Sequence, residues 1–139
     1  MPATVTGILE TALYVADVER SAAFYEKLMG FRRLLAEDRL IGMSVGDSHQ
    51  VLLLFKKGGS TQPSPMHGGL IPAHDGQGTL HMAFAIPADS LPDWHSRLSE
   101  NNVSLESELV TEQGGTSIYF RDLDNHLIEL ATPGIWPTY

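Results

Sequence analysis

The chain has 139 residues, of which 42% are hydrophobic and 19% charged, and this is typical of one globular domain. It contains no cysteine, which excludes disulfide scaffolds, thiolate metal sites and cysteine nucleophiles. Its 17 acidic and 9 basic residues give a net charge of −8, whereas binding to duplex nucleic acid needs clustered Lys and Arg. The longest apolar run, residues 51–55, is too short to span a bilayer, and residues 1–10 lack a signal-peptide pattern. We therefore expect a cytoplasmic protein with neither nucleic-acid nor membrane partners.

One segment rich in glycine and proline divides the chain. Nine of the 23 residues from 56 to 78 are Gly or Pro, and no hydrophobic period runs through them. Loops of this length in compact domains are usually functional or disordered. We predict a linker at about 57–78 within a single domain. The first module then covers about residues 7–56 and the second about residues 79–135.

The first half predicts the order β-α-β-β-β. A β-rich run at residues 8–15 comes first, and Asp17 then offers a helix N-cap. Apolar residues recur at helical spacing up to Gly30, which is typical of a helix C-cap. Three short strands are predicted next, at 31–36, 40–45 and 50–55.

The second half repeats that order. We predict a strand at 80–86, a helix with a capping-box-like start at Ser90, and strands at 105–110, 117–121 and 127–131. Laid over each other, the halves match Glu10 with His81 at an offset of 71, and His49 with His126 at an offset of 77. Repetition of the whole order of elements indicates an internal duplication.

Three polar residues lie in predicted strands where a buried side chain would be apolar: Glu10, His81 and Glu129. Each is followed by alanine two positions later, and residues at i and i+2 share one face of a strand. A metal ligand beside small side chains leaves room for an ion and a bound molecule. The alternative is that Glu10 faces water on an edge strand, that Glu129 is solvated on a half-exposed strand, and that His81 is a hydrogen-bonded core histidine.

Two blocks of the sequence, residues 8–31 and 81–136, resemble the vicinal oxygen chelate superfamily. The resemblance is strongest in YFRDLDNHLIEL at 119–130. That superfamily includes glyoxalase I, extradiol dioxygenases, fosfomycin-resistance enzymes and bleomycin-resistance proteins. The resemblance implies an α+β fold of two tandem βαβββ modules, forming a curled, mixed eight-stranded cup with the helices outside.

The resemblance also implies one divalent ion, with Glu10, His81 and Glu129 as its ligands. The remaining coordination positions would take water and a chelating small-molecule substrate. Glu10 or Glu129 could also act as the catalytic base. Two carboxylates and one neutral imidazole cancel the charge of a divalent ion and suit several metals, so Fe, Mn, Ni, Co, Zn and Mg all stay open.

The sequence departs from two patterns within the superfamily. Glyoxalase I usually has a fourth ligand on the last strand of the first module, and the offset of 77 places Leu52 there. Extradiol dioxygenases have a tail signature that Tyr119, Asp122 and Glu129 partly match. Leu123 and Asn125 stand where that signature has Pro and Gly. The histidine expected just upstream is also missing.

Six further residues are candidates for contact with substrate. Tyr119 and Arg121 share a predicted strand face and could contact an acidic substrate. Tyr14 and Gln50, in predicted strands of the first module, are similar candidates. His67 and His74 lie in the linker, where they could form a lid and act as acid or base. The alternative for the two histidines is that they are solvated loop residues.

The sequence favours a metal-dependent lyase or isomerase of the glyoxalase type, acting on a small oxygenated substrate. An iron-dependent ring-cleaving dioxygenase is one alternative. A metal-free drug-binding protein, similar to the bleomycin-resistance members, is the other. By resemblance we also expect a homodimer.

Overall fold

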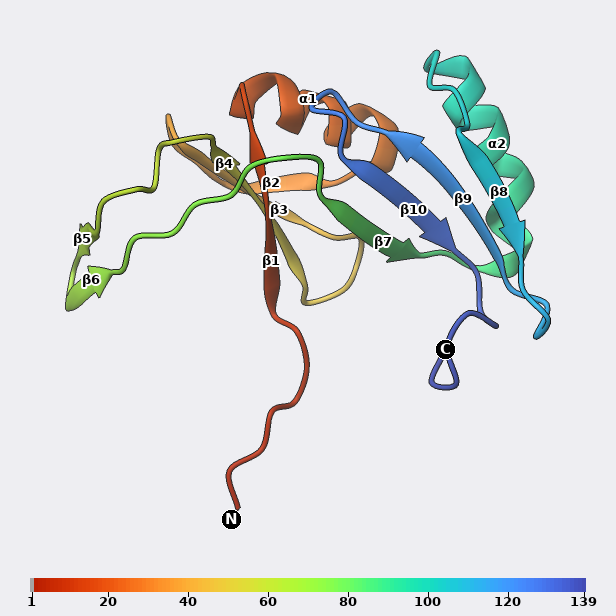
Figure 1. The fold of residues 1–139 in the computed structure, drawn as a ribbon, viewed down its shortest axis with the longest axis horizontal. Helices are drawn as coiled ribbons and strands as arrows, with labels where there is room; N and C mark the ends of the chain where they lie inside the picture. The colour runs from red at the N-terminus through yellow and green to blue at the C-terminus, as the bar shows by residue number, and fades with distance from the viewer. Residues whose placement is uncertain (1) are drawn as a thin grey trace. The chain divides into compact units, whose positions relative to one another are not determined.

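The computed structural model describes residues 2–139, which form two compact units. The first ends at Gln77 and the second runs from Gly78 to Tyr139. Each unit contains one open, mixed four-stranded sheet and one α-helix (Figure 1). No helix within residues 2–139 is long and apolar enough to cross a membrane.

The first unit begins with a βαβββ module. Its elements are β1 (Glu10–Val15), α1 (Val18–Met29), β2 (Arg32–Ala36), β3 (Leu40–Ser44) and β4 (Val51–Lys56). The strand order in the sheet is β1-β4-β3-β2, in which β1 runs parallel to β4 and the other pairs are antiparallel. The predicted β-α-β-β-β order is therefore confirmed.

Caps fix both ends of α1 at the residues that the sequence indicates. The Asp17 side chain accepts a hydrogen bond from the backbone N–H of Arg20 at 3.1 Å, which satisfies one of the free donors of the first turn. Gly30 ends the helix in the left-handed conformation, at φ 72°, where glycine has no Cβ penalty. Between the caps, the buried stripe of α1 packs on β3 and β4.

In the first sheet, β1 and β4 each have one buried face and one open, more accessible face. In β1, Leu13 and Val15 are buried, whereas Glu10 is exposed and Tyr14 half-buried. This alternation confirms that Glu10, Ala12 and Tyr14 share one face, because side chains alternate along a strand. The open face therefore carries the polar candidates.

The linker contains a hairpin that the sequence analysis did not predict. Strands β5 (Ser64–Met66) and β6 (Gly69–Ile71) pair across a turn formed by His67 and Gly68, with Gly68 at φ 94°. Strands of three residues are too short to show a hydrophobic period, and Pro65 argues against a strand. The hairpin extends away from the four-stranded sheet of its own unit (Figure 1).

The second unit repeats the module. Its elements are β7 (His81–Ala85), the short 3-10 helix η1 (Ala88–Ser90), α2 (Leu91–Glu100), β8 (Ser107–Val110), β9 (Thr116–Arg121) and β10 (Leu127–Ala131). The strand order β7-β10-β9-β8, with β7 parallel to β10, matches the first sheet strand for strand. The α+β fold of two βαβββ modules is confirmed.

The predicted capping box at the start of α2 is wrong. Ser90 has helical backbone angles and makes no side-chain cap; its hydroxyl donates to the carbonyl of Pro87 at 2.7 Å instead. The preceding 3-10 turn leads directly into the helix, and Pro92 in the first turn has no N–H to satisfy.

The strand registers correct the alignment of the two modules. Glu10 pairs with Val51 and His81 pairs with Leu127, so Leu53 is the equivalent of Glu129, and Leu52 is not. The offset between equivalent residues is 77 for β3 and β9 but 76 for β4 and β10. It falls by one because four residues, 46–49, form the turn between β3 and β4, whereas three residues, 123–125, form the turn between β9 and β10. For the same reason the equivalent of His126 is Gln50 and not His49. Leucine still occupies the place of the fourth glyoxalase ligand.

Candidate metal centre

The open face of the second sheet brings His81 and Glu129 together. His81 begins β7, and Glu129 lies at the middle of the neighbouring strand β10, where it pairs with Ala83. His81 Nε2 lies 3.2 Å from Glu129 Oε1. The His81 side chain is 51% exposed and that of Glu129 only 10%, so the pair joins a solvent-accessible nitrogen to a nearly buried carboxylate.

A backbone carbonyl sets the tautomer of His81. The Nδ1 atom lies 2.9 Å from the carbonyl oxygen of Leu127, and a carbonyl can only accept, so Nδ1 carries the proton. In a neutral imidazole the Nε2 lone pair then faces the carboxylate oxygen. Two acceptors that face each other need a cation or a proton between them, so this contact is either an imidazolium–carboxylate ion pair or part of a metal site.

The distance between the two atoms fits adjacent ligands of one metal ion. Bonds of about 2.1 Å to nitrogen and oxygen give an N···O separation of about 3.0 Å at an octahedral angle and about 3.4 Å at a tetrahedral angle. The observed 3.2 Å lies between these values. Histidine that ligates a metal typically donates its other N–H to a carbonyl or carboxylate, as His81 does.

Ser117 holds the other oxygen of Glu129. Its hydroxyl donates to Glu129 Oε2 at 2.6 Å, and the exposed fractions of the two residues are 1% and 7%. That hydrogen bond leaves Oε1 directed toward His81. The carboxylate is therefore fixed in one orientation by a neighbouring strand.

Tyr119 lies next to this pair on the same face. It is directly opposite Glu129 in the β9–β10 ladder, and the centre of its ring lies 6.4 Å from that of His81. Ala83 and Ala131 are small and share the face. The structure thus brings together two predicted ligands and one predicted substrate contact.

Glu10 holds the same place in the first sheet as His81 does in the second. It begins β1, its side chain is exposed on the open face, and its partner Val51 corresponds to Leu127. In the part of the chain from residue 2 to residue 139, no three His, Asp or Glu side chains gather closely enough to hold a metal ion. Of the three predicted ligands, the structure brings His81 and Glu129 within contact distance of each other.

A second cluster, made of Tyr14, Phe55 and His74, lies on the open face of the first sheet. The Tyr14 hydroxyl oxygen is 2.7 Å from His74 Nδ1, the Tyr14 and Phe55 rings stack at 5.8 Å, and His74 meets Phe55 edge-on at 4.5 Å. Burial, and secondarily the charge of Asp75, raise the pKa of Tyr14. This cluster ties the end of the linker to β1 and β4 and makes His74 a packed residue, not a free loop side chain.

The remaining predicted substrate contacts are less well placed. Gln50 is exposed just before β4, and His67 is exposed in the turn of the β5–β6 hairpin. The guanidinium of Arg121 donates to the Glu106 carboxylate at 2.9 Å and to the carbonyl of Asn125 at 3.2 Å. These hydrogen bonds tie the Arg121 side chain to Glu106 and to the turn between β9 and β10.

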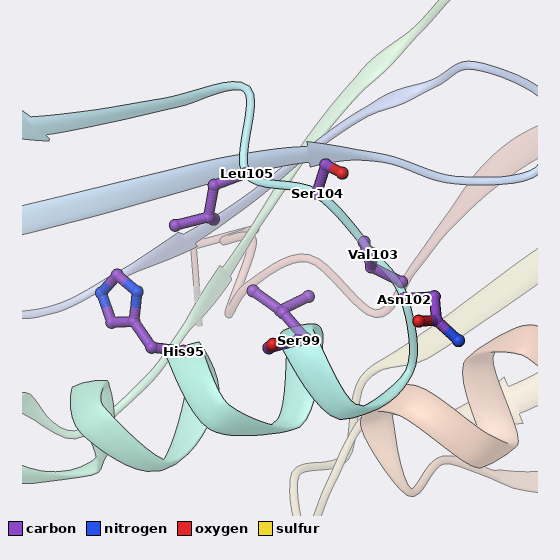
Figure 2. Close-up of a pocket in the computed structure, with 7 residues that line it drawn as sticks. His95, Ser99, Asn102, Val103, Ser104 and Leu105 are labelled. Atoms are coloured by element: carbon purple, nitrogen blue, oxygen red, sulfur yellow. The ribbon is translucent and has the colours of Figure 1, made fainter.

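A hollow on the second unit lies apart from the candidate metal centre. It is formed by α2 and the connection to β8, as Figure 2 shows, and its lining residues are His95, Leu98, Ser99, Asn102, Val103, Ser104 and Leu105. His95 Nε2 lies 2.9 Å from Glu108 Oε1 and so ties the helix to β8. None of the predicted site residues lines it.

Sequence reasoning missed Ser117 and Phe55. Ser117 lies two residues before Tyr119, so the alternation of β9 already placed it on the same face. Only the register of β9 against β10 shows that it reaches Glu129, and the sequence does not give that register. The sequence indicates only that Phe55 belongs to an apolar strand.

Comparison with known proteins identifies the superfamily. The sequence profile of the glyoxalase/bleomycin resistance protein/dioxygenase superfamily matches residues 7–130. This chain belongs to that superfamily. The match covers both modules, together with Glu10, His81 and Glu129.

Several relatives are metallothiol transferases. The chain is 26% identical over 133 residues to metallothiol transferase FosB of Bacillus licheniformis, covering 95% of this chain and 79% of the relative. It is 29% identical over 131 residues to FosB of Lysinibacillus sphaericus, covering 93% and 84%. These similarities extend across both modules.

Solved structures of the superfamily share the fold. A lactoylglutathione lyase from Agrobacterium tumefaciens superposes with a TM-score of 0.86 at 26% identity, covering 97% of this chain and 99% of that one. A FosX variant from Listeria monocytogenes, solved with Mn(II) and a dihydroxypropylphosphonic acid, gives 0.67 at 22% identity, covering 91% and 90%. The likeness to the FosX variant shows only that the two proteins share a fold.

Proposed function

We propose that this protein is a metal-dependent enzyme in which Glu10, His81 and Glu129 hold one divalent ion that binds oxygens of a small substrate. The observation that carries the proposal is the pairing of His81 Nε2 with Glu129 Oε1, each oriented by a second hydrogen bond. Glu10 completes the set as the counterpart of His81 in the duplicated module.

Each residue of the site has a distinct role in this proposal. When bound, the ion acts as a Lewis acid on the substrate oxygens. Glu129 is buried and hydrogen-bonded to Ser117, so it would remain a fixed ligand, whereas exposed Glu10 would give up its place as a ligand to take a proton from the substrate. Tyr119, beside His81, contacts the bound substrate, and its phenol can donate a hydrogen bond.

We propose lyase or isomerase chemistry of the glyoxalase type as the reaction. The lactoylglutathione lyase supports this, because it matches 97% of this chain at 26% identity. The substrate would then contain a thiol-derived sulfur next to vicinal oxygens. Leu53 in place of a fourth ligand leaves one more coordination position open to that substrate than in glyoxalase I.

Transfer of a thiol to a small oxygenated acceptor is the second candidate. The FosB relatives favour it, because they are metallothiol transferases similar to this chain over nearly all of its length. Both candidates use a thiol compound and a divalent ion. Ring cleavage by iron and oxygen is a third possibility within the superfamily, and it alone consumes oxygen.

A parallel assay separates these reactions. Protein is loaded in turn with Mn, Fe, Co, Ni, Zn or Mg and tested in three assays. The first measures turnover of lactoylglutathione, and the second measures loss of free thiol when a thiol compound and fosfomycin are both supplied. The third measures oxygen uptake in the presence of a catechol. We expect turnover in the first assay, and the variants Glu10→Ala, His81→Ala and Glu129→Ala should each lose it together with bound metal. Turnover that survives complete metal removal would contradict a metal-dependent mechanism.

We further propose that the protein is a homodimer. The β5–β6 hairpin exposes Met66, Leu70 and Ile71, with 58%, 66% and 46% of their surfaces accessible. Apolar side chains grouped on a projecting hairpin are typical of a surface that another subunit covers. A second copy of this chain is the occupant that the family resemblance implies.

A further inference from the structure

We infer that Ser117 is a positioning residue that sets the affinity and coordination geometry of the metal centre through Glu129. The inference rests on the proposed function, because it gives Ser117 a role only if Glu129 ligates an ion. Ser117 itself does not touch the ion or the substrate in this proposal.

The hydrogen bond between the two residues has the geometry of a strong, charge-assisted contact. The Ser117 hydroxyl donates to Glu129 Oε2 at 2.6 Å, within the range typical of O–H···O⁻ bonds. Both residues are buried, at 1% and 7% exposure, so water does not replace this bond easily. With Oε2 occupied, Glu129 presents the single oxygen Oε1 toward His81 Nε2.

Ser117 is paired with a neighbouring strand on each side. It lies inside β9 and pairs directly with Ala131 of β10, two residues along from Glu129. Neighbouring strands on both sides, β8 and β10, hold its backbone. A hydroxyl held this way fixes the carboxylate rotamer before an ion arrives, which reduces the entropy that ion binding must remove.

The other module provides an internal comparison. By strand register, Leu40 of β3 corresponds to Ser117, just as Leu53 of β4 corresponds to Glu129. The duplicated scaffold therefore carries leucine at both positions in one sheet, and serine with glutamate in the other. The serine is not needed to build the βαβββ module, since the first sheet forms with leucine in its place.

Ser117→Ala is the direct test, and Ser117→Thr keeps the hydroxyl. Ser21→Ala is the matched control, because Ser21 is also a buried serine, at 2% exposure, but lies on α1. Binding of Mn(II) and Co(II) to the full chain is titrated for each variant by calorimetry, and the visible absorption spectrum of the Co(II) form reports coordination geometry.

We expect Ser117→Ala to weaken metal binding by about 10–100-fold, the usual effect of losing a partner of a metal ligand. Its Co(II) spectrum should change, since Glu129 can rotate or bind through both oxygens. Ser117→Thr should restore binding to within a few-fold of the wild type, and Ser21→Ala should bind like the wild type.

Two outcomes would overturn the inference and leave the proposed function standing. One is a Ser117→Ala variant with wild-type affinity and an unchanged Co(II) spectrum. The other is an equal loss in Ser21→Ala, which would show that any buried serine affects binding through stability alone. A wild-type protein that binds neither ion would instead overturn the proposed function, and the inference with it.

Discussion

At the residue scale, the candidate site depends on which atoms are already occupied. The Leu127 carbonyl occupies His81 Nδ1 and the Ser117 hydroxyl occupies Glu129 Oε2, so the free atoms Nε2 and Oε1 face each other. Isolated histidines and glutamates are common in strands. A histidine and a glutamate that are each oriented by a hydrogen bond, with Nε2 and Oε1 3.2 Å apart, are suited to bind one metal ion.

The raised pKa of Tyr14 makes a prediction about pH. Burial, and then the charge of Asp75, favour the neutral phenol in the folded protein, so its pKa lies above the ordinary value of 10.0. Because the pKa is higher in the folded state, the contribution of Tyr14 to the free energy of unfolding is complete below the unfolded pKa. It is lost as pH rises through the folded pKa.

Absorbance at 295 nm, titrated for the wild type and for Tyr14→Phe, measures this directly. The difference between the two curves isolates one of the four tyrosines, and we expect its midpoint above pH 10.0. Asp75→Asn should lower that midpoint only partly, because burial is the larger cause. A midpoint at or below pH 10.0 would contradict the described packing of Tyr14.

The sequence identified the residue types of the site better than their contacts. Glu10, His81, Glu129 and Tyr119 were placed on the correct strands and faces, because period-two alternation depends only on local spacing. The partners that orient them, Ser117 and the Leu127 carbonyl, lie on or across other strands. No local pattern gives the distance between strands.

At the element scale, the linker contains structure that hydrophobic periodicity does not predict. Its composition predicts a loop, yet residues 64–71 form a hairpin and His74 and Gly76 pack on Tyr14. Helix α1 was predicted closely because caps and a buried stripe are local signals. The sequence alignment matched Glu129 with Leu52 instead of Leu53 because the β3–β4 turn has one extra residue. The exact bounds of elements and turns are the least certain features of a sequence-based prediction.

Gly76→Ala tests how tightly the linker packs on the first sheet. A Cβ at position 76 would overlap the Tyr14 ring, which Phe55 and His74 hold in place. We expect a loss of about 1–3 kcal/mol in the free energy of unfolding, measured by urea denaturation, as for overpacked positions.

Gly69→Ala is the matched control for that change. It lies in the same linker, and an added Cβ there meets no atom within 4 Å. The control should stay within about 0.5 kcal/mol of the wild type, as surface substitutions usually do. Equal effects at positions 69 and 76 would show that Tyr14 does not pack against Gly76 in solution.

At the scale of the whole molecule, the chain is one module built twice. The two sheets share strand order and direction, but only the second carries a carboxylate at the centre of its last strand. We propose that the two modules form a single domain, and the match of one superfamily profile to residues 7–130 supports this. A shared scaffold with unequal side chains is typical of a duplicated domain whose halves have specialised.

The proposed homodimer predicts a solution mass of twice the chain mass of 15.2 kDa. Light scattering after size-exclusion chromatography measures it. Leu70→Asp, on the exposed hairpin, should shift the protein toward the monomer, because a charge buried in an apolar interface is costly. A wild-type protein that is monomeric at micromolar concentration would contradict the dimer.

The most direct test of the metal centre is the metal content of untagged protein, purified without chelator and measured by elemental mass spectrometry for the wild type and for His81→Ala. We predict about one divalent ion per chain in the wild type and a large loss in the variant, because His81 Nε2 is a first-row metal ligand in this account. A wild type that holds no ion and takes none up from added Mn, Fe, Co, Ni, Zn or Mg would contradict the account. So would a His81→Ala variant with full occupancy.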